Sequence, residues 1–253
     1  NLHTFRWGRL TAHDPLAVEA VVASISGVQA EPRTRTLDEL IVHREALLTA
    51  YQDRAYADRY LRFVEEVRQA AGRLEGGEAL TRAVAHNLAR LMAYKDEYEV
   101  ARLHTEAAFR QRLNAQFDGD FKLKFHLSPP LLAPKDKTTG LPKKIEFGGW
   151  ILPVFKVLRK LKGLRGTALD PVGWTHERRT ERRLIADYEA MIRELLGALT
   201  QAKLPVAVQL AELPSEIVGY GYIKDRNLAA AEIKKSQLLE AFATADQPKM
   251  AAE

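Results

Sequence analysis

The stretch that decides the fold is LDELIVHREALLTAYQDRAYADRYLRFVEEVRQAAGRL, residues 37–74. Apolar residues recur along it at helical spacing, Thr36 is a suitable N-cap, and the glycines that follow residue 71 supply stop signals. The stretch therefore predicts one or two helices. Aromatic residues at helical spacing usually lie in a core, so we interpret three of them as packing residues rather than a cofactor site: Tyr51, Tyr56 and Tyr60.

More helices are predicted on both sides of one short region with a β pattern. Helical spacing covers residues 78–115, 150–163, 175–199, 203–218 and 223–242. Between the first two of these, FKLKFHL (121–127) alternates apolar and polar residues, and KKIEF (143–147) can pair with it. The proline-rich segment that joins them is predicted to be an extended loop. We therefore expect a mainly α fold, a multi-helix bundle-like domain with one small β-hairpin near 121–147.

The chain divides into three segments by pattern. The polar stretch around Pro32 separates residues 1–30 from a helical domain over 31–242, and residues 243–253 lack periodicity and are expected to be a frayed tail. Because the chain begins at Asn1 rather than Met, we expect it to be part of a longer polypeptide.

Composition excludes several classes of protein. Of the 253 residues, 46% are hydrophobic and 28% charged, which is typical of a globular domain. The chain has no cysteine, so it holds no disulfide, no thiolate zinc site and no cysteine-bound iron–sulfur cluster. No apolar run is long enough to cross a bilayer and no signal peptide is recognisable, which predicts a cytoplasmic protein without a membrane partner.

Basic residues are concentrated between positions 135 and 183. This window holds 13 bases and 5 acids, a net charge of 13 − 5 = +8, whereas the whole chain has +5. One interpretation is a surface that binds phosphate or another anion, such as coenzyme A. Its candidate residues are Lys143, Lys144, Arg159, Lys162 and Arg165. The other interpretation, equally supported, is a solvated charged face.

Two further segments carry charge where apolar or acidic residues are expected. In MAYKDEYEVARLH (92–104), a ladder of alternating charge follows the apolar stripe of residues 84–91, and HERRTERR (176–183) places four arginines at the start of a helix, where the dipole favours acids. We expect the two segments to face each other as a structural ion network, and we prefer this to a catalytic constellation. Its members are Lys95, Glu97, Glu99, Arg102, Glu106, Arg178, Arg179, Arg182 and Arg183.

Known catalytic motifs are absent from the sequence. There is no GxxxxGK[ST], no GxGxxG after a strand, no HExxH and no GxSxG, and the seven histidines show no metal-ligand spacing. We therefore predict no catalytic residue and no metal site in this chain.

Taken together, FRWGRLTAHDP, LARLMAYKDEYEVARLH, FKLKFHLSPPLLA, LKGLRGTALDP and HERRTERRLIADYE resemble the carboxy-terminal region of the large fused bacterial indolepyruvate ferredoxin oxidoreductases. The similarity runs in order from about residue 4 to residue 242. It implies a parent enzyme that uses thiamine diphosphate, magnesium, iron–sulfur clusters and coenzyme A to decarboxylate arylpyruvates oxidatively and to reduce ferredoxin. It also implies that residues 1–30 form the junction with the preceding oxidoreductase domain.

This chain lacks the residues that such chemistry requires. Thiamine diphosphate binding calls for GDG followed by asparagines, and only DGD occurs here, at 118–120. Three hypotheses follow: a non-catalytic helical domain that packs against the upstream catalytic domains; a domain that also contributes a basic surface for coenzyme A or substrate; and a free-standing basic RNA-binding protein. The third is weakest, because no aromatic residues interleave with the bases. Homo-oligomer formation is left open.

Overall fold

The computed structural model describes residues 2–18, 21, 35–117, 119, 121–128, 143–219 and 221–246. The chain forms two compact units, Asn1–Thr36 and Leu37–Glu253. The first contains α1 (Leu2–His13). The boundary follows residue 36, whereas the sequence placed it after residue 30, because the second unit starts directly with its first helix. Most of the predicted tail, from residue 247, lies outside the described residues.

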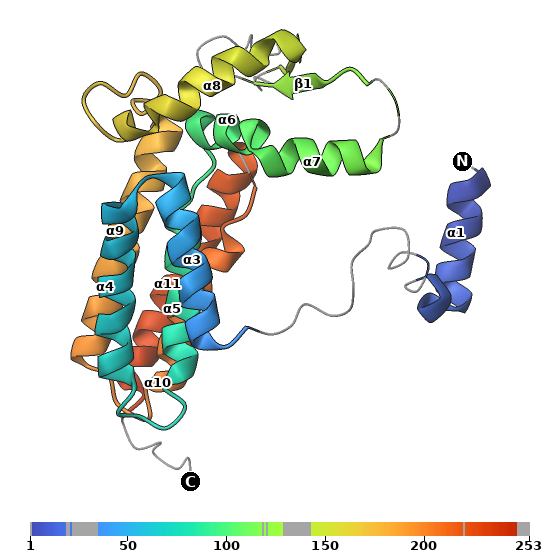
Figure 1. Ribbon diagram of the computed structural model, residues 1–253. Coiled ribbons are helices and arrows are strands. Elements are labelled where there is room, and N and C mark those ends of the chain that lie inside the picture. Colours follow the sequence, from blue (N-terminus) through green and yellow to red (C-terminus); the bar gives the residue numbers. More distant parts are fainter. Residues whose placement is uncertain are drawn as a thin grey trace. The chain divides into compact units, whose positions relative to one another are not determined.

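Six helices form what we call the helical body, in which they run alongside one another (Figure 1). They are α3 (Leu37–Tyr51), α4 (Arg54–Ala71), α5 (Glu78–Met92), α9 (His176–Gly197), α10 (Leu204–Glu212) and α11 (Tyr222–Thr244), with a 3-10 turn, η3 (Leu213–Glu216), after α10. The deciding stretch is thus two helices. Asp53 separates them, because its side chain accepts the N–H of Tyr56 at 2.8 Å and caps α4.

The helical body encloses one large apolar core. Leu48 of α3, Val67 of α4, Leu88 of α5 and Ile192 of α9 are all fully buried in it. The turn from α4 to α5 depends on glycine: Gly76 has φ +74° and a Cβ at Gly77 would lie 1.9 Å from the Ala71 carbonyl oxygen. Of the three tyrosines interpreted as packing residues, Tyr51 and Tyr60 are fully buried and Tyr56 is partly buried against the core, as expected.

The helix predicted over 78–115 is wrong in one respect, because the chain breaks it twice. After α5, residues 93–96 form a link, followed by α6 (Glu97–Thr105) and α7 (Ala107–Gln116). Asp96 has extended backbone angles (φ −119°, ψ −177°), and its carboxylate accepts the N–H of Glu99 at 2.8 Å. This cap starts a new helix with a new direction, so the stripe of α5 does not continue onto Lys95.

The predicted β-hairpin is present. β1 (Lys124–Leu127) pairs antiparallel with β2 (Ile145–Gly148), with Phe125 opposite Phe147. The first strand begins three residues later than predicted, and the proline-rich loop lies outside the described residues. The mainly α fold with one small hairpin is thereby confirmed.

A 3-10 turn, η1 (Gly149–Ile151), leads from the hairpin into α8 (Leu152–Lys160), and a second, η2 (Leu161–Leu164), follows. We call α6, α7, the two strands, η1 and α8 the hairpin module; α8 packs along α6 at one end of the helical body (Figure 1). Its own core has four buried residues: Ala101, Phe125, Ile151 and Phe155. Val154, on the same helix as Phe155, is exposed. Among the described helices, none is long and apolar enough to span a membrane.

Candidate functional site

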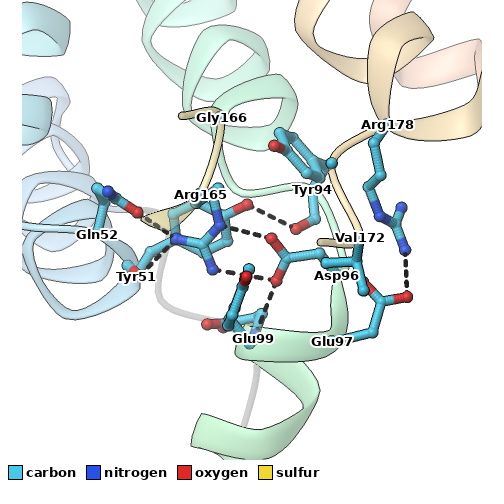
Figure 2. A network of polar contacts seen from close by, with 12 residues as sticks. Tyr51, Gln52, Tyr94, Asp96, Glu97, Glu99, Arg165, Gly166, Val172 and Arg178 are labelled. Carbon is cyan, nitrogen blue, oxygen red and sulfur yellow. Dashed lines mark hydrogen bonds and ion pairs between the residues drawn. The ribbon is translucent and has the colours of Figure 1, made fainter. Parts of the chain in front are cut away.

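Buried charges concentrate where the hairpin module joins the helical body. Arg165, directly after η2, lies against Asp96, the cap of α6: Nε donates to Oδ2 at 2.5 Å and Nη2 to Oδ1 at 3.0 Å (Figure 2). Their side chains are only 6% and 2% exposed. This two-bond pair is the centre of the site that we call the junction.

The same guanidinium also closes the end of α3. Nη1 of Arg165 donates to the Tyr51 carbonyl at 2.8 Å and to Oε1 of Gln52 at 2.6 Å, and the group lies 3.7 Å from the centre of the Tyr51 ring (Figure 2). Burial by itself lowers the pKa of Arg165, but the hydrogen bonds to Asp96 and the surrounding negative groups outweigh it and raise the pKa. The cation is therefore permanent, and it joins three separate parts of the chain.

A second buried carboxylate fixes the loop that carries Arg165. Asp170 is buried and accepts backbone N–H groups of Gly166 at 2.8 Å, Gly173 at 3.0 Å and Val172 at 3.2 Å. It also accepts the hydroxyl of Tyr98 in α6 at 3.0 Å. Burial, and then the hydrogen bond and charge of Asp170, raise the pKa of Tyr98, so the phenol keeps its proton and acts as a donor.

The charged ladder is satisfied mainly within its own helix. Arg102 donates to Glu99 through Nη2 at 2.6 Å and Nε at 2.7 Å, and it also pairs with Glu106. The hydrogen bond to Glu99 is the largest cause of the raised pKa of Arg102, and burial partly opposes it. Glu99 is therefore neutralised by a partner three residues away on the same helix and not by an arginine of residues 178–183.

The two charged segments do meet at one point. Nη2 of Arg178 lies 3.3 Å from Oε1 of Glu97. The dashed line between the two side chains in Figure 2 marks this pair. The other arginines of α9 have different contacts: Arg182 donates to the Gly173 carbonyl at 2.7 Å and Arg183 lies 3.9 Å from Asp187. Within the described parts of the chain, Arg179 has no ion pair. Lys95 is exposed on the link before α6.

The five bases proposed to bind an anion do not form one open surface. Lys162 donates to the Ala50 carbonyl at 2.8 Å, and burial, followed by the charges of Arg102 and Arg165, lowers its pKa. Arg165 is committed to the junction. Lys143 and Lys144, before β2, and Arg159, on α8, are exposed.

Sequence reasoning missed the two carboxylates on which the junction depends, Asp96 and Asp170. Both have a recognisable signal. DEYE at 96–99 has the spacing of a helix-capping box, and Asp170 precedes Pro171 in a turn-forming dipeptide. It also missed two pairs that join distant helices: Arg59 with Glu189 at 2.9 Å, and Lys224 with Glu181 at 2.5 Å. Neither pair has a local sequence signal.

The polar groups at the junction hold separate parts of the chain together. Its carboxylates accept hydrogen bonds from Arg165, Tyr98 and backbone amides, and burial raises the pKa of Tyr51 and of Tyr94. No nucleophile is paired there with a base. In the described residues, no cluster of three or more His, Cys, Asp or Glu residues could hold a metal ion.

Comparison with known proteins identifies one family. The model of a family described as a family of unknown function (DUF6537) matches residues 37–237, which begins at the first residue of α3 and ends within α11. No curated protein and no solved structure matches the chain.

Proposed function

The chain belongs to the DUF6537 family, a family of unknown function, and we propose that it is a non-catalytic helical assembly domain of an enzyme that resembles the indolepyruvate ferredoxin oxidoreductases. In this proposal the parent enzyme decarboxylates arylpyruvates oxidatively, forms acyl-coenzyme A and reduces ferredoxin. Thiamine diphosphate, magnesium and the iron–sulfur clusters belong to the upstream catalytic domains of the same polypeptide, and this chain binds none of them.

The observation that carries the proposal is the use made of buried charge. Arg165 pairs with Asp96, and Asp170 accepts backbone N–H groups of the loop that follows Arg165. Glu99 and Arg102 pair with each other within α6. An active site holds groups with unused bonding capacity aimed at a substrate. Here the buried carboxylates fix the position of one module on another, which is what a domain with an architectural role requires.

A second candidate function, a coenzyme A surface, retains one favourable observation. Lys143, Lys144 and Arg159 are exposed, and the charges of Lys144 and Arg159, which have no ion pair within the described residues, are accessible to a diphosphate group. Lys162 and Arg165, however, face protein groups, which leaves three of the five proposed bases.

The test uses the polypeptide that contains this chain. Lys143, Lys144 and Arg159 are replaced together by alanine, and the rate of arylpyruvate-dependent ferredoxin reduction is measured as a function of coenzyme A concentration. We expect KM for coenzyme A and kcat to be unchanged. A raised KM with intact assembly would favour the second candidate function.

A parallel variant tests the architectural role. Arg165→Met loosens the junction, so sedimentation should show less assembled enzyme, while kcat per assembled complex stays at the wild-type value. If assembly is normal and kcat falls, the junction belongs to an active site and the proposal is wrong. If the wild-type polypeptide does not oxidise arylpyruvates, the proposed identity of the parent enzyme is wrong.

A further inference from the structure

The outer side of α8 carries an unusual combination of apolar and basic residues. This helix lies on the side of α6 that points away from the helical body (Figure 1). Val154 and Val157 of α8 and Leu161 of η2 follow each other at i, i+3 and i+7 and are all exposed, and Trp150 of η1, four residues before Val154, is 65% exposed. We call these four residues the apolar row. Exposed apolar side chains are ordinary singly, but a contiguous row of them marks an interaction surface.

A second row runs beside the first. Lys156 and Lys160 lie one turn apart, and at 100° per residue both fall on the same side of the apolar row, whereas Arg159 lies on the far side of the helix, almost opposite that row. All three are exposed, and none has a carboxylate partner among the described residues. We call Lys156 and Lys160 the basic row.

We propose that this face of α8 docks a protein helix whose own apolar row is bordered by carboxylates. The inference rests on the proposed function, since it supplies the partner surface of the assembly domain. The apolar row extends for about 16 Å from residue 150 to residue 161, or three turns of helix, and the basic row covers about one turn beside it. Apolar packing on one row and ion pairs on the other would fix both the position and the direction of such a partner.

The arrangement favours a protein helix over an anionic membrane surface. A helix that lies in a bilayer interface has its polar face opposite the apolar one, with bases available to both borders. In α8 the basic row borders the apolar row on one side only. The other border is the buried side of the helix, where Ile151 and Phe155 pack into the hairpin module. This one-sided arrangement matches a partner helix whose apolar row has carboxylates along one side.

Site-specific photocrosslinking in the polypeptide that contains this chain tests the proposal. A photoreactive phenylalanine analogue, p-benzoylphenylalanine, is placed at Val157, and separately at Val42 of α3 as the matched control. Both are exposed valines on helices, 58% and 62% accessible, so neither substitution disturbs a core. After illumination, the crosslinked peptides are identified by mass spectrometry.

We expect position 157 to give at least five-fold more adduct than position 42, with the label on a helical segment rich in Asp or Glu. Lys156→Glu with Lys160→Glu should reduce the yield at position 157 at least five-fold, whereas Arg62→Glu with Arg73→Glu, exposed bases of the helical body, should not. Adducts to lipid, to another part of this chain, or at the level of the control would overturn the proposal. Specific adducts in a polypeptide without arylpyruvate oxidation would leave the docking intact and remove only the proposed parent enzyme.

Discussion

The helical body and the hairpin module are both rich in helix, but they are held together by different means. The body buries a continuous apolar core drawn from all six of its helices. The module has an apolar core of only four buried residues and is fastened to the body by Arg165, Asp96 and Asp170. A small core cannot fix the orientation of a module by packing alone, and buried ion pairs contribute geometry more reliably than net stability. Where the module has too little apolar area to fix its position on the body, buried charged residues fix it instead.

The largest expected effect comes from breaking the junction. Arg165→Met leaves Asp96 as a buried carboxylate without its cation, which should lower the free energy of unfolding by about 3–5 kcal/mol in urea denaturation. Adding Asp96→Asn to this variant should recover part of the loss, because the uncompensated charge is removed. Arg193→Met is the control, since its pair with Glu66 is about half exposed and contributes under about 1 kcal/mol. A loss below about 1 kcal/mol for Arg165→Met would mean that the junction is solvated.

The next prediction separates the two cores. Phe155→Ala removes a side chain that packs against Phe125 and the His104 ring, and should lower the free energy of opening of the hairpin module by about 3 kcal/mol. In hydrogen exchange, the amides of α6 and α8 should lose protection while those of α5 and α9 keep theirs. Val157→Ala, on the same helix but exposed, should change neither by more than about 0.5 kcal/mol. Equal loss in both regions would show that they unfold as one unit.

Glu99→Ala should have an effect similar in kind to that of the junction but smaller. It leaves the buried cation of Arg102 with only Glu106, and should cost about 3 kcal/mol in urea denaturation. Glu106→Ala is the matched variant: it removes the second partner of the same arginine, but its side chain is 34% exposed and the bidentate pair with Glu99 remains. We expect it to cost under about 1 kcal/mol. Equal costs would contradict the assignment of Glu99 as the main partner.

The smallest expected effect is a dependence of the module on pH. His104 has a buried Nδ1 with no hydrogen-bond partner among the described residues and is surrounded by phenylalanine rings. Burial, and then the charge of Lys95, lower its pKa. The unfolded chain therefore binds the proton more readily, so this contribution to stability is full above the unfolded pKa of about 6.5 and is lost as the pH falls toward the folded pKa.

The measurement for His104 is urea denaturation at pH 7.5 and pH 5.5, followed by Trp150 fluorescence for the module and far-ultraviolet circular dichroism for the body. His104→Phe should remove much of the module's pH dependence. His86 is the control in the body, because burial and Arg44 lower its pKa too. His86→Phe should therefore change the pH dependence of the unfolding followed by far-ultraviolet circular dichroism. It should leave the pH dependence of the unfolding followed by Trp150 fluorescence unchanged. An unchanged pH dependence in His104→Phe would show that another group titrates.

Sequence alone predicted the fold class and most helices, because helical spacing, caps and glycine stops are local signals. It failed at Asp96, where one capping side chain redirects the chain and interrupts a stripe that otherwise reads as continuous. It anticipated a contact between α6 and α9, which Glu97 and Arg178 make, but it did not decide which glutamate of the ladder makes that contact. It could not place Arg165 at the junction, because nothing local indicates that residues 51, 96 and 165 meet.

The tyrosine hydroxyls of α3 and α4 have a consequence for how the chain can vary in length. Tyr56 donates to the Met92 carbonyl and Tyr51 to the Tyr94 carbonyl, each at 3.0 Å, so side chains from two other helices satisfy the carbonyl groups where α5 ends. Two residues beyond Tyr94, Asp96 is held by Arg165. The link between body and module is thus pinned at both ends over only a few residues. The link is too short and too firmly held to accommodate an inserted or deleted residue. Relatives of this chain should therefore vary in length elsewhere.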